Sequence, residues 1–158
     1  MTKVLYVIAL SGLCLRAEPS TKAPAVNILP YATKVMGTVE DGWLQTEEGY
    51  LCGEYLAETD PLDDAQYLGT WKLTAYAETG LATACGEYPE AHVTAAHNTL
   101  PFGSRIYVRD HGVWTIQDRG PESMGSEWAD LYLADHQTCV DFGMRTADVY
   151  LLPEEEMP

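Results

Sequence analysis

Short apolar runs alternate with turn-forming residues over the first part of the chain. These runs occupy residues 4–10, 13–15, 26–29, 34–39 and 43–46. No apolar pattern with the period of a helix competes with them, so each run is predicted to be a strand. The pairs Asp41-Gly42 and Glu48-Gly49 lie between runs as hairpin signals. Many short strands in so short a segment predict a small β-barrel.

Past residue 66 the pattern again favours strands. Alternation and apolar runs predict them at residues 71–76, 105–108, 113–116, 129–134 and 147–152. Only residues 136–144 have helical character, with Asp135 as the N-cap and Gly143 as the stop. This part is therefore expected to be mostly β with one short helix.

Residues 58–66 separate the two parts. The segment is acidic, carries Pro61 and lacks an apolar period, which is typical of a short exposed linker. We therefore expect a mainly β protein with two domains, residues 1–57 and 67–153, followed by an acidic tail at 154–158.

The charge balance is strongly acidic, with 24 Asp and Glu against 9 Lys and Arg and a net charge of −15. Nucleic acid is an unsuitable partner, because binding phosphates requires clustered basic side chains. Adhesion to an anionic membrane is disfavoured for the same reason. No run approaches the ~20 apolar residues of a membrane span. The run at residues 4–10 fits a strand better than a secretory signal, which stays the alternative.

Cysteine and histidine spacing gives no sign of a metal site. The residues in question are Cys14, Cys52, Cys85, Cys139, His92, His111 and His136. The cysteines form no close pair, so four free thiols are slightly favoured over one disulfide in each domain. The histidines have no ligand-like spacing, and we expect neither a metal nor another cofactor.

The first domain resembles the bacterial SH3-type domain of cell-wall proteins. The matching residues are 13–21 (LCLRAEPST), 42–44 (GWL) and 49–56 (GYLCGEYL). The resemblance implies an SH3-like small barrel; such domains often bind peptidoglycan, whereas others only pack against a neighbour. Trp43, Tyr50 and Tyr55 are equally suited to packing and to a binding face.

The second domain resembles the double-psi β-barrel group of cell-wall enzymes. Residues 95–105 (AAHNTLPFGSR) and 118–121 (DRGP) are similar to the rare lipoprotein A branch. Asp130-Leu131-Tyr132, His136, Gly143 and Arg145-Thr146 are similar to the "3D" branch, named for three aspartates. The resemblance implies a six-stranded double-psi barrel that acts as a peptidoglycan lytic transglycosylase without a cofactor. We then expect a monomer in the cell wall or outside the cell, with glycan strands and stem peptide as partners.

The resemblance also implies roles for individual residues. Asp118 matches the acid of the family, His97 matches a residue required in the lipoprotein branch, and Asp130 matches the second aspartate of the 3D pattern. The third aspartate falls at Ala134, and the adjacent Asp135 is better explained as a helix cap. His97, Asp118 and Asp130 therefore remain as the expected catalytic set.

Glycan cleavage explains why such residues are needed. A carboxylic acid must protonate the leaving oxygen while positive charge develops on the sugar. A lytic transglycosylase uses the sugar's own 6-hydroxyl as nucleophile, so one carboxyl group can serve as acid and then as base. Its pKa must be raised by burial or by a like charge, which Asp130 would supply beside Asp118 and Arg119 would oppose if it pointed inward.

Each candidate residue has an ordinary alternative. Asp118 fits a turn, His97 a hydrogen-bonded loop, and Asp130 a charge that protects an edge strand. Arg105, Thr99 and Tyr132 are candidates for substrate binding. Arg105 either binds a substrate carboxylate or pairs with a nearby acid. The rival functions are a non-catalytic glycan-binding protein and a phage-associated lysis or structural component.

Overall fold

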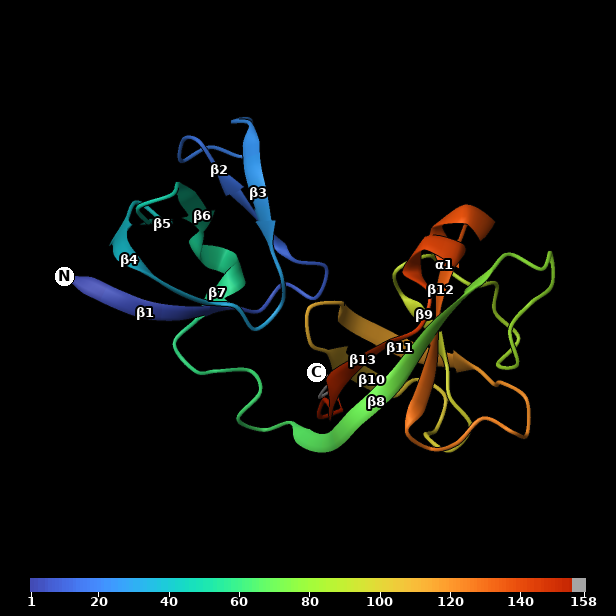
Figure 1. The fold of residues 1–158 in the computed structure, drawn as a ribbon. Helices are drawn as coiled ribbons and strands as arrows, with labels where there is room; N and C mark the ends of the chain where they lie inside the picture. Colours follow the sequence, from blue (N-terminus) through green and yellow to red (C-terminus); the bar gives the residue numbers. More distant parts are fainter. Residues whose placement is uncertain (155–158) are drawn as a thin grey trace. The chain divides into compact units, whose positions relative to one another are not determined.

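The computed structural model describes residues 1–154 and is mainly β (Figure 1). It divides into two compact units, Met1–Asp64 and the residues from Ala65 onward. The boundary lies inside the segment expected as a linker. The expected acidic tail at 154–158 lies outside the described residues, apart from Glu154.

The first unit is built on one curved sheet. In this part of the described chain the sheet has seven strands in the order β3-β2-β6-β5-β4-β1-β7. The strands are β1 (Thr2–Val7), β2 (Leu13–Arg16), β3 (Ala25–Leu29), β4 (Lys34–Glu40), β5 (Trp43–Gln45), β6 (Tyr50–Cys52) and β7 (Leu56–Ala57), with a 3-10 helix η1 (Gly53–Tyr55). The core consists of Leu5, Val7, Leu13, Leu15, Leu44 and Leu51.

The expected hairpin at Asp41-Gly42 joins β4 to β5. Both residues have positive φ, 50° at Asp41 and 82° at Gly42. Such a pair of left-handed residues matches the twist of the flanking strands, which is why a glycine is favoured here. This local prediction is confirmed.

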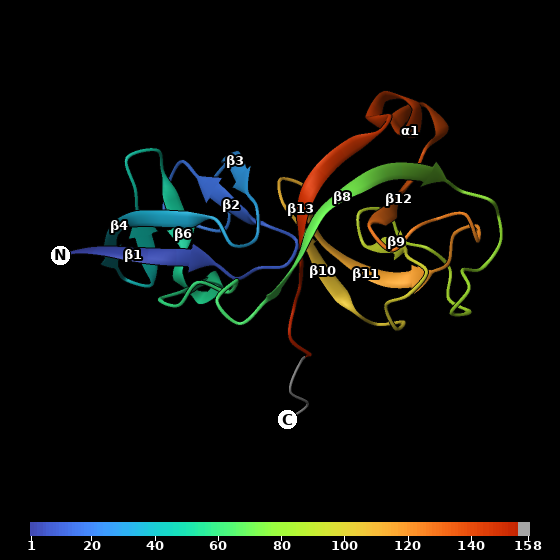
Figure 2. The same ribbon diagram turned by 60° about the horizontal axis from the view of Figure 1, so that its bottom comes forward.

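The second unit contains a closed barrel of six strands, in the order β10-β11-β9-β12-β8-β13 (Figure 2). The strands are β8 (Gln66–Ala77), β9 (Thr94–Ala96), β10 (Arg105–Val108), β11 (Gly112–Asp118), β12 (Trp128–Ala134) and β13 (Arg145–Leu151). The barrel is mixed, because β8 pairs with β12 and β9 with β11 in parallel, whereas the other pairs are antiparallel.

Side-chain alternation separates the core of the barrel from its outer face. The core contains Trp71, Leu73, Ala95, Ile106, Val108, Trp114, Ile116, Ala129, Leu131 and Val149. Successive side chains of a strand point to opposite faces. Positions 72, 74 and 76 of β8, and 128, 130 and 132 of β12, therefore face away from this core and carry the polar groups of the site described below.

The short helix α1 (His136–Phe142) follows β12. Asp135 caps it, since its carboxylate accepts hydrogen bonds from the backbone N–H and the hydroxyl of Thr138. Gly143 ends it with a φ of 63°. The predicted helix and both of its caps are confirmed.

Two further expectations concern covalent and membrane structure. Cys14, Cys52, Cys85 and Cys139 are free thiols. Within residues 1–154, no helix has the length and apolar character needed to cross a membrane.

Candidate active site

One row of paired residues places Asp118 and Asp130 on the two sides of Ala96. Asp118 is paired with Ala96, Ala96 with Asp130, and Asp130 with Thr74. The register of β11 shifts between Ile116 and Asp118, which leaves Gln117 unpaired in a bulge. Bulges re-aim side chains next to active sites. Because of this bulge, Asp118 rather than Gln117 is paired with Ala96.

Asp118 accepts three hydrogen bonds. Its Oδ1 receives the backbone N–H groups of Ala84 and Arg119, both at 2.9 Å. Its Oδ2 receives the hydroxyl of Tyr76 at 3.0 Å. The carboxylate is thus fixed by β8, by its own turn and by the loop at residues 78–93.

The loop that provides Ala84 is itself fastened to β11. Thr83 is buried, and both its N–H and its hydroxyl donate to the carbonyl of Glu87. The N–H of Cys85 donates to the carbonyl of Gln117 at 3.1 Å. These bonds hold the Ala84 amide against the carboxylate.

Asp130 has different surroundings. Its Oδ1 accepts a hydrogen bond from the Thr74 hydroxyl at 2.9 Å, and that hydroxyl accepts one from the indole N–H of Trp128 at 2.8 Å. Burial raises the pKa of Asp130, and the negative charge of Asp118 raises it further, whereas the bond from Thr74 acts in the opposite direction. The Asp130 carboxyl group therefore retains a proton more readily than an ordinary aspartate does.

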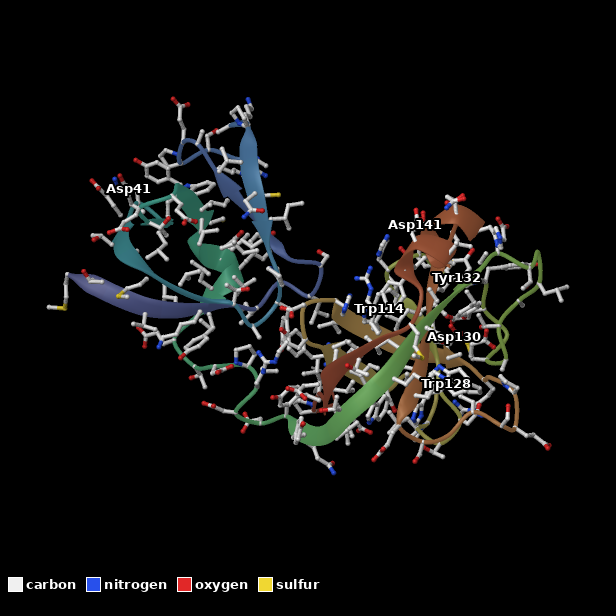
Figure 3. All side chains as sticks on the ribbon, in the orientation of Figure 1. Asp41, Trp114, Trp128, Asp130, Tyr132 and Asp141 are labelled. Carbon is white, nitrogen blue, oxygen red and sulfur yellow. The ribbon has the colours of Figure 1, made fainter. Side chains whose placement is uncertain are left out.

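Tyr76 lies between the two acids. Burial and the charge of Asp118 raise the pKa of its phenol above the usual range, and the charge of Asp130 adds to the effect. Tyr76 is thus a neutral donor. Its ring contacts that of Tyr132 edge to face, with centroids 5.3 Å apart. Figure 3 shows Tyr132, Asp130 and Trp128 following one another along β12.

His97 is almost completely buried, at 1% exposure, and both ring nitrogens are used inside the protein. Nδ1 accepts the backbone N–H groups of Thr99 and Leu100, so Nε2 carries the proton and donates to the carbonyl of Ser126 at 2.8 Å. The ring stacks on Trp71 at 4.6 Å. Burial lowers the pKa of His97, and the charge of Arg119 lowers it further. The histidine is a neutral anchor for its loop.

The guanidinium group of Arg119 contacts the loop that follows His97. Its guanidinium donates to the carbonyl of His97 at 2.7 Å and lies 4.0 Å from the ring centre of Phe102. Only its backbone N–H bonds to Asp118.

The three residues expected to bind substrate lie in different places. Tyr132 is buried against Tyr76, beside the two acids. Thr99 is exposed and contributes a backbone N–H to His97. Arg105 lies on β10 and donates to the carbonyl of Pro153 at 3.1 Å, so its guanidinium is engaged by the C-terminal segment.

Sequence reasoning missed the groups that join the two acids, namely Thr74, Tyr76, Ala84 and Trp128. The alternation of β8 was a usable signal for two of them. It placed Thr74 and Tyr76 on the face opposite to Leu73, so both could be expected among the polar side chains that surround Asp130.

No protein-family model matches the chain, and no curated protein sequence matches it. Within residues 1–154, no cluster of three or more His, Cys, Asp or Glu side chains is arranged to hold a metal ion. Both family resemblances therefore stay hypotheses, and the geometry of the two carboxyl groups is the firmest basis for a function.

Proposed function

We propose that the barrel is a lytic transglycosylase that cleaves the glycan strand of peptidoglycan between MurNAc and GlcNAc. The observation that carries the proposal is the unequal pair of carboxyl groups. Asp118 accepts three hydrogen bonds, whereas Asp130 accepts one from Thr74 and has a raised pKa. A carboxyl group whose surroundings raise its pKa, with a second carboxyl group in the same row, suits acid and base chemistry at one bond.

Asp130 then carries the proton, a role that the resemblance assigned to Asp118. Its carboxyl group donates a proton to the glycosidic oxygen while the bond from that oxygen to C1 of the sugar breaks. The 6-hydroxyl of the same sugar attacks C1 and returns its proton to Asp130. The product is a 1,6-anhydro sugar, and no water is consumed.

Asp118 and Tyr76 complete this scheme. The charge of Asp118 raises the pKa of Asp130 and also favours the positive charge that develops on the sugar. Tyr76 holds the charged oxygen in place through its 3.0 Å hydrogen bond. His97 acts by holding residues 97–100, because neither of its ring nitrogens is left to transfer a proton.

In the same proposal the first unit is an SH3-like module that targets the wall. A groove of about 930 Å³ in this unit supports a binding role. It is lined by Leu15, Leu29 and Leu51 together with polar residues that include Lys34 and Glu48. A lining that mixes apolar and polar groups suits a polar ligand such as a glycan.

The test is incubation of the full chain with purified peptidoglycan, followed by mass spectrometry. The expected products are 1,6-anhydro-muropeptides. Asp130→Asn and Asp118→Asn should each remove the product while circular dichroism shows an unchanged fold. Ala84→Gly is a matched control, since it retains the backbone N–H that faces Asp118.

Each other result has a definite meaning. New reducing ends without anhydro sugars would show hydrolysis by an activated water and would overturn the transglycosylase proposal. Binding without any product would favour the non-catalytic glycan-binding protein. Unchanged product from Asp130→Asn would remove that residue from the proton-carrying role.

A further inference from the structure

A lysine lies one outward pair from Asp130 in the register of β8 and β12. The ammonium group of Lys72 lies 3.9 Å from the centre of the Trp128 ring. The two residues are paired in the parallel register of β8 and β12. The ring attracts the cation electrostatically and restricts the otherwise flexible side chain.

This pair belongs to the same ladder as Asp130. Lys72–Trp128, Thr74–Asp130 and Tyr76–Tyr132 are successive outward pairs of β8 and β12. Two residues along a strand correspond to about 6.6 Å. The indole N–H of Trp128 donates a hydrogen bond to the Thr74 hydroxyl, which in turn donates to Asp130. Trp128, whose ring holds Lys72, is therefore linked to Asp130 through Thr74.

Among the described residues, Lys72 is one of several cations without an ion pair, as are Lys22 and Lys34. The chain carries a net charge of −15, yet within residues 1–154 no carboxylate forms an ion pair with Lys72. Lys3 and Arg109, by contrast, pair with Glu58 and Asp148. An ammonium group has three donors and no acceptor, and the aromatic face uses none of them as a conventional hydrogen bond.

We propose that Lys72, held by Trp128, is the subsite for a carboxylate of the substrate. The proposal rests on the function proposed above and adds a requirement to it, namely that the glycan carries an anionic group about one sugar's width from the bond that is cleaved. Muramic acid offers two sources of this group. Its lactyl ether ends in a free carboxylate when the peptide is absent, and the stem peptide carries carboxylates when it is present.

The same geometry assigns a definite role to Trp128. One face of the indole is covered by the ammonium group, so that face is not available for stacking against a sugar ring. Trp128 positions the lysine and contacts Thr74, and the lysine contacts the substrate.

The test measures binding to the full chain carrying Asp130→Asn, so that no ligand is consumed. Three soluble ligands of equal length are titrated: a glycan with free lactyl carboxylates, a glycan with stem peptides attached, and a neutral N-acetylglucosamine oligomer. The anionic ligand that fits should bind more tightly than the neutral one. The comparison of the first two identifies the source of the carboxylate.

Substitution of the lysine should then remove this preference. Lys72→Met is expected to weaken binding of the preferred ligand roughly tenfold, the change expected for loss of a charge-assisted hydrogen bond. Binding of the neutral oligomer should stay the same. Lys72→Arg should retain most of the preference. Lys22→Met, an exposed lysine of the first unit, is the charge-matched control and should change nothing.

Equal binding of the anionic ligands by the Lys72→Met and parent proteins would overturn the proposal, as would an equal loss for the neutral oligomer. These outcomes are independent of cleavage. If the protein without substitutions yields no anhydro product but the preference depends on Lys72, the subsite stands and the enzymatic function fails. If product forms but the preference for the anionic ligand is absent, the enzymatic function stands and the Lys72 subsite fails.

Discussion

The hydroxyl of Tyr76 donates to Oδ2 of Asp118 at 3.0 Å, and the same phenol lies close enough to Asp130 for the charge of that residue to raise its pKa. One side chain of β8 thus connects acids that belong to β11 and β12. This neutral donor lies between two carboxyl groups with different hydrogen-bond partners. Two aspartates thus share one row of the barrel and still have different surroundings.

The first prediction concerns Asp130 and pH. The pKa of its carboxyl group is raised above the ordinary value of 3.8, so the folded protein binds this proton more tightly than the unfolded chain does. The resulting stability is complete below pH 3.8 and is lost as the pH rises through the folded pKa. Asp130→Asn should therefore be more stable than the parent protein at pH 7, and the difference should shrink below pH 4.

Thermal unfolding of both proteins at pH 7 and at pH 3.5 measures this effect. The asparagine can still accept the hydrogen bond from Thr74, which makes the substitution conservative. An equal difference in stability at the two pH values would show that the pKa of Asp130 does not change on folding.

Tyr76→Phe should weaken both stability and cleavage. The change removes one donor from Asp118 and leaves the ring contact with Tyr132 in place. We expect a loss of about 1 kcal/mol in the free energy of unfolding and a lower kcat, because the carboxylate is less firmly held. Urea titration and product formation measure the two effects.

Tyr132→Phe is the matched control for stability. Within the described residues no hydrogen bond of the Tyr132 hydroxyl is found, although its ring packs against the same neighbour. A loss of stability as large as that of Tyr76→Phe would mean that the bond to Asp118 contributes nothing.

Local signals were enough to predict several elements of the fold. Asp135 and Gly143 bracket α1 because caps depend on a few neighbouring residues. The strands β1 to β5 follow from apolar runs and from the left-handed turn at Asp41-Gly42, whereas β6 and β7 were not predicted. The strand order of the closed barrel could not be predicted from such local signals, because it pairs segments that are far apart in sequence.

The site shows the same division between local and distant information. The sequence allowed Asp118 and Asp130 to be chosen as candidate acids. Their place in one row depends on the bulge at Gln117 and on the pairing of Ala96 with both, which local sequence does not reveal. Tyr76 was missed because its partner is 42 residues away. The buried environment of His97 was equally hidden, since it comes from Trp71 and from the carbonyl of Ser126.

His97→Gln should reduce stability in a pH-dependent way. The pKa of the buried imidazole is lowered from 6.5, so its contribution to stability is present above pH 6.5 and is lost as the pH falls through the lower folded pKa. The variant should be clearly less stable than the parent protein at pH 7.5. Its stability should also fall less than that of the parent as the pH is lowered, because it has no imidazole to protonate. Thermal unfolding between pH 7.5 and pH 5 measures both features.

The same variant separates anchoring from catalysis. At a temperature where it is fully folded, its cleavage rate per folded molecule should stay within a few-fold of the parent protein. A loss of several hundred-fold, with the fold intact, would return His97 to a direct part in proton transfer.

Ala96→Val should separate the two acids. Ala96 is paired with both Asp118 and Asp130 and is only 3% exposed, so added methyl groups must enter the space between the carboxyl groups. Overpacking of this kind costs about 1–3 kcal/mol. The pKa of Asp130 should also fall, because the charge of Asp118 is then farther away, and the pH optimum of cleavage should move down.

Ala95→Val provides the matched comparison, because Ala95 precedes Ala96 on β9 and points into the barrel core. Both variants should lose stability, since both force methyl groups into filled space. Only Ala96→Val should lower the cleavage rate per folded molecule by more than a hundred-fold and shift its pH optimum. If both variants reduced cleavage equally, the effect would arise from the packing of β9, and the spacing of the two aspartates would not be what the reaction requires.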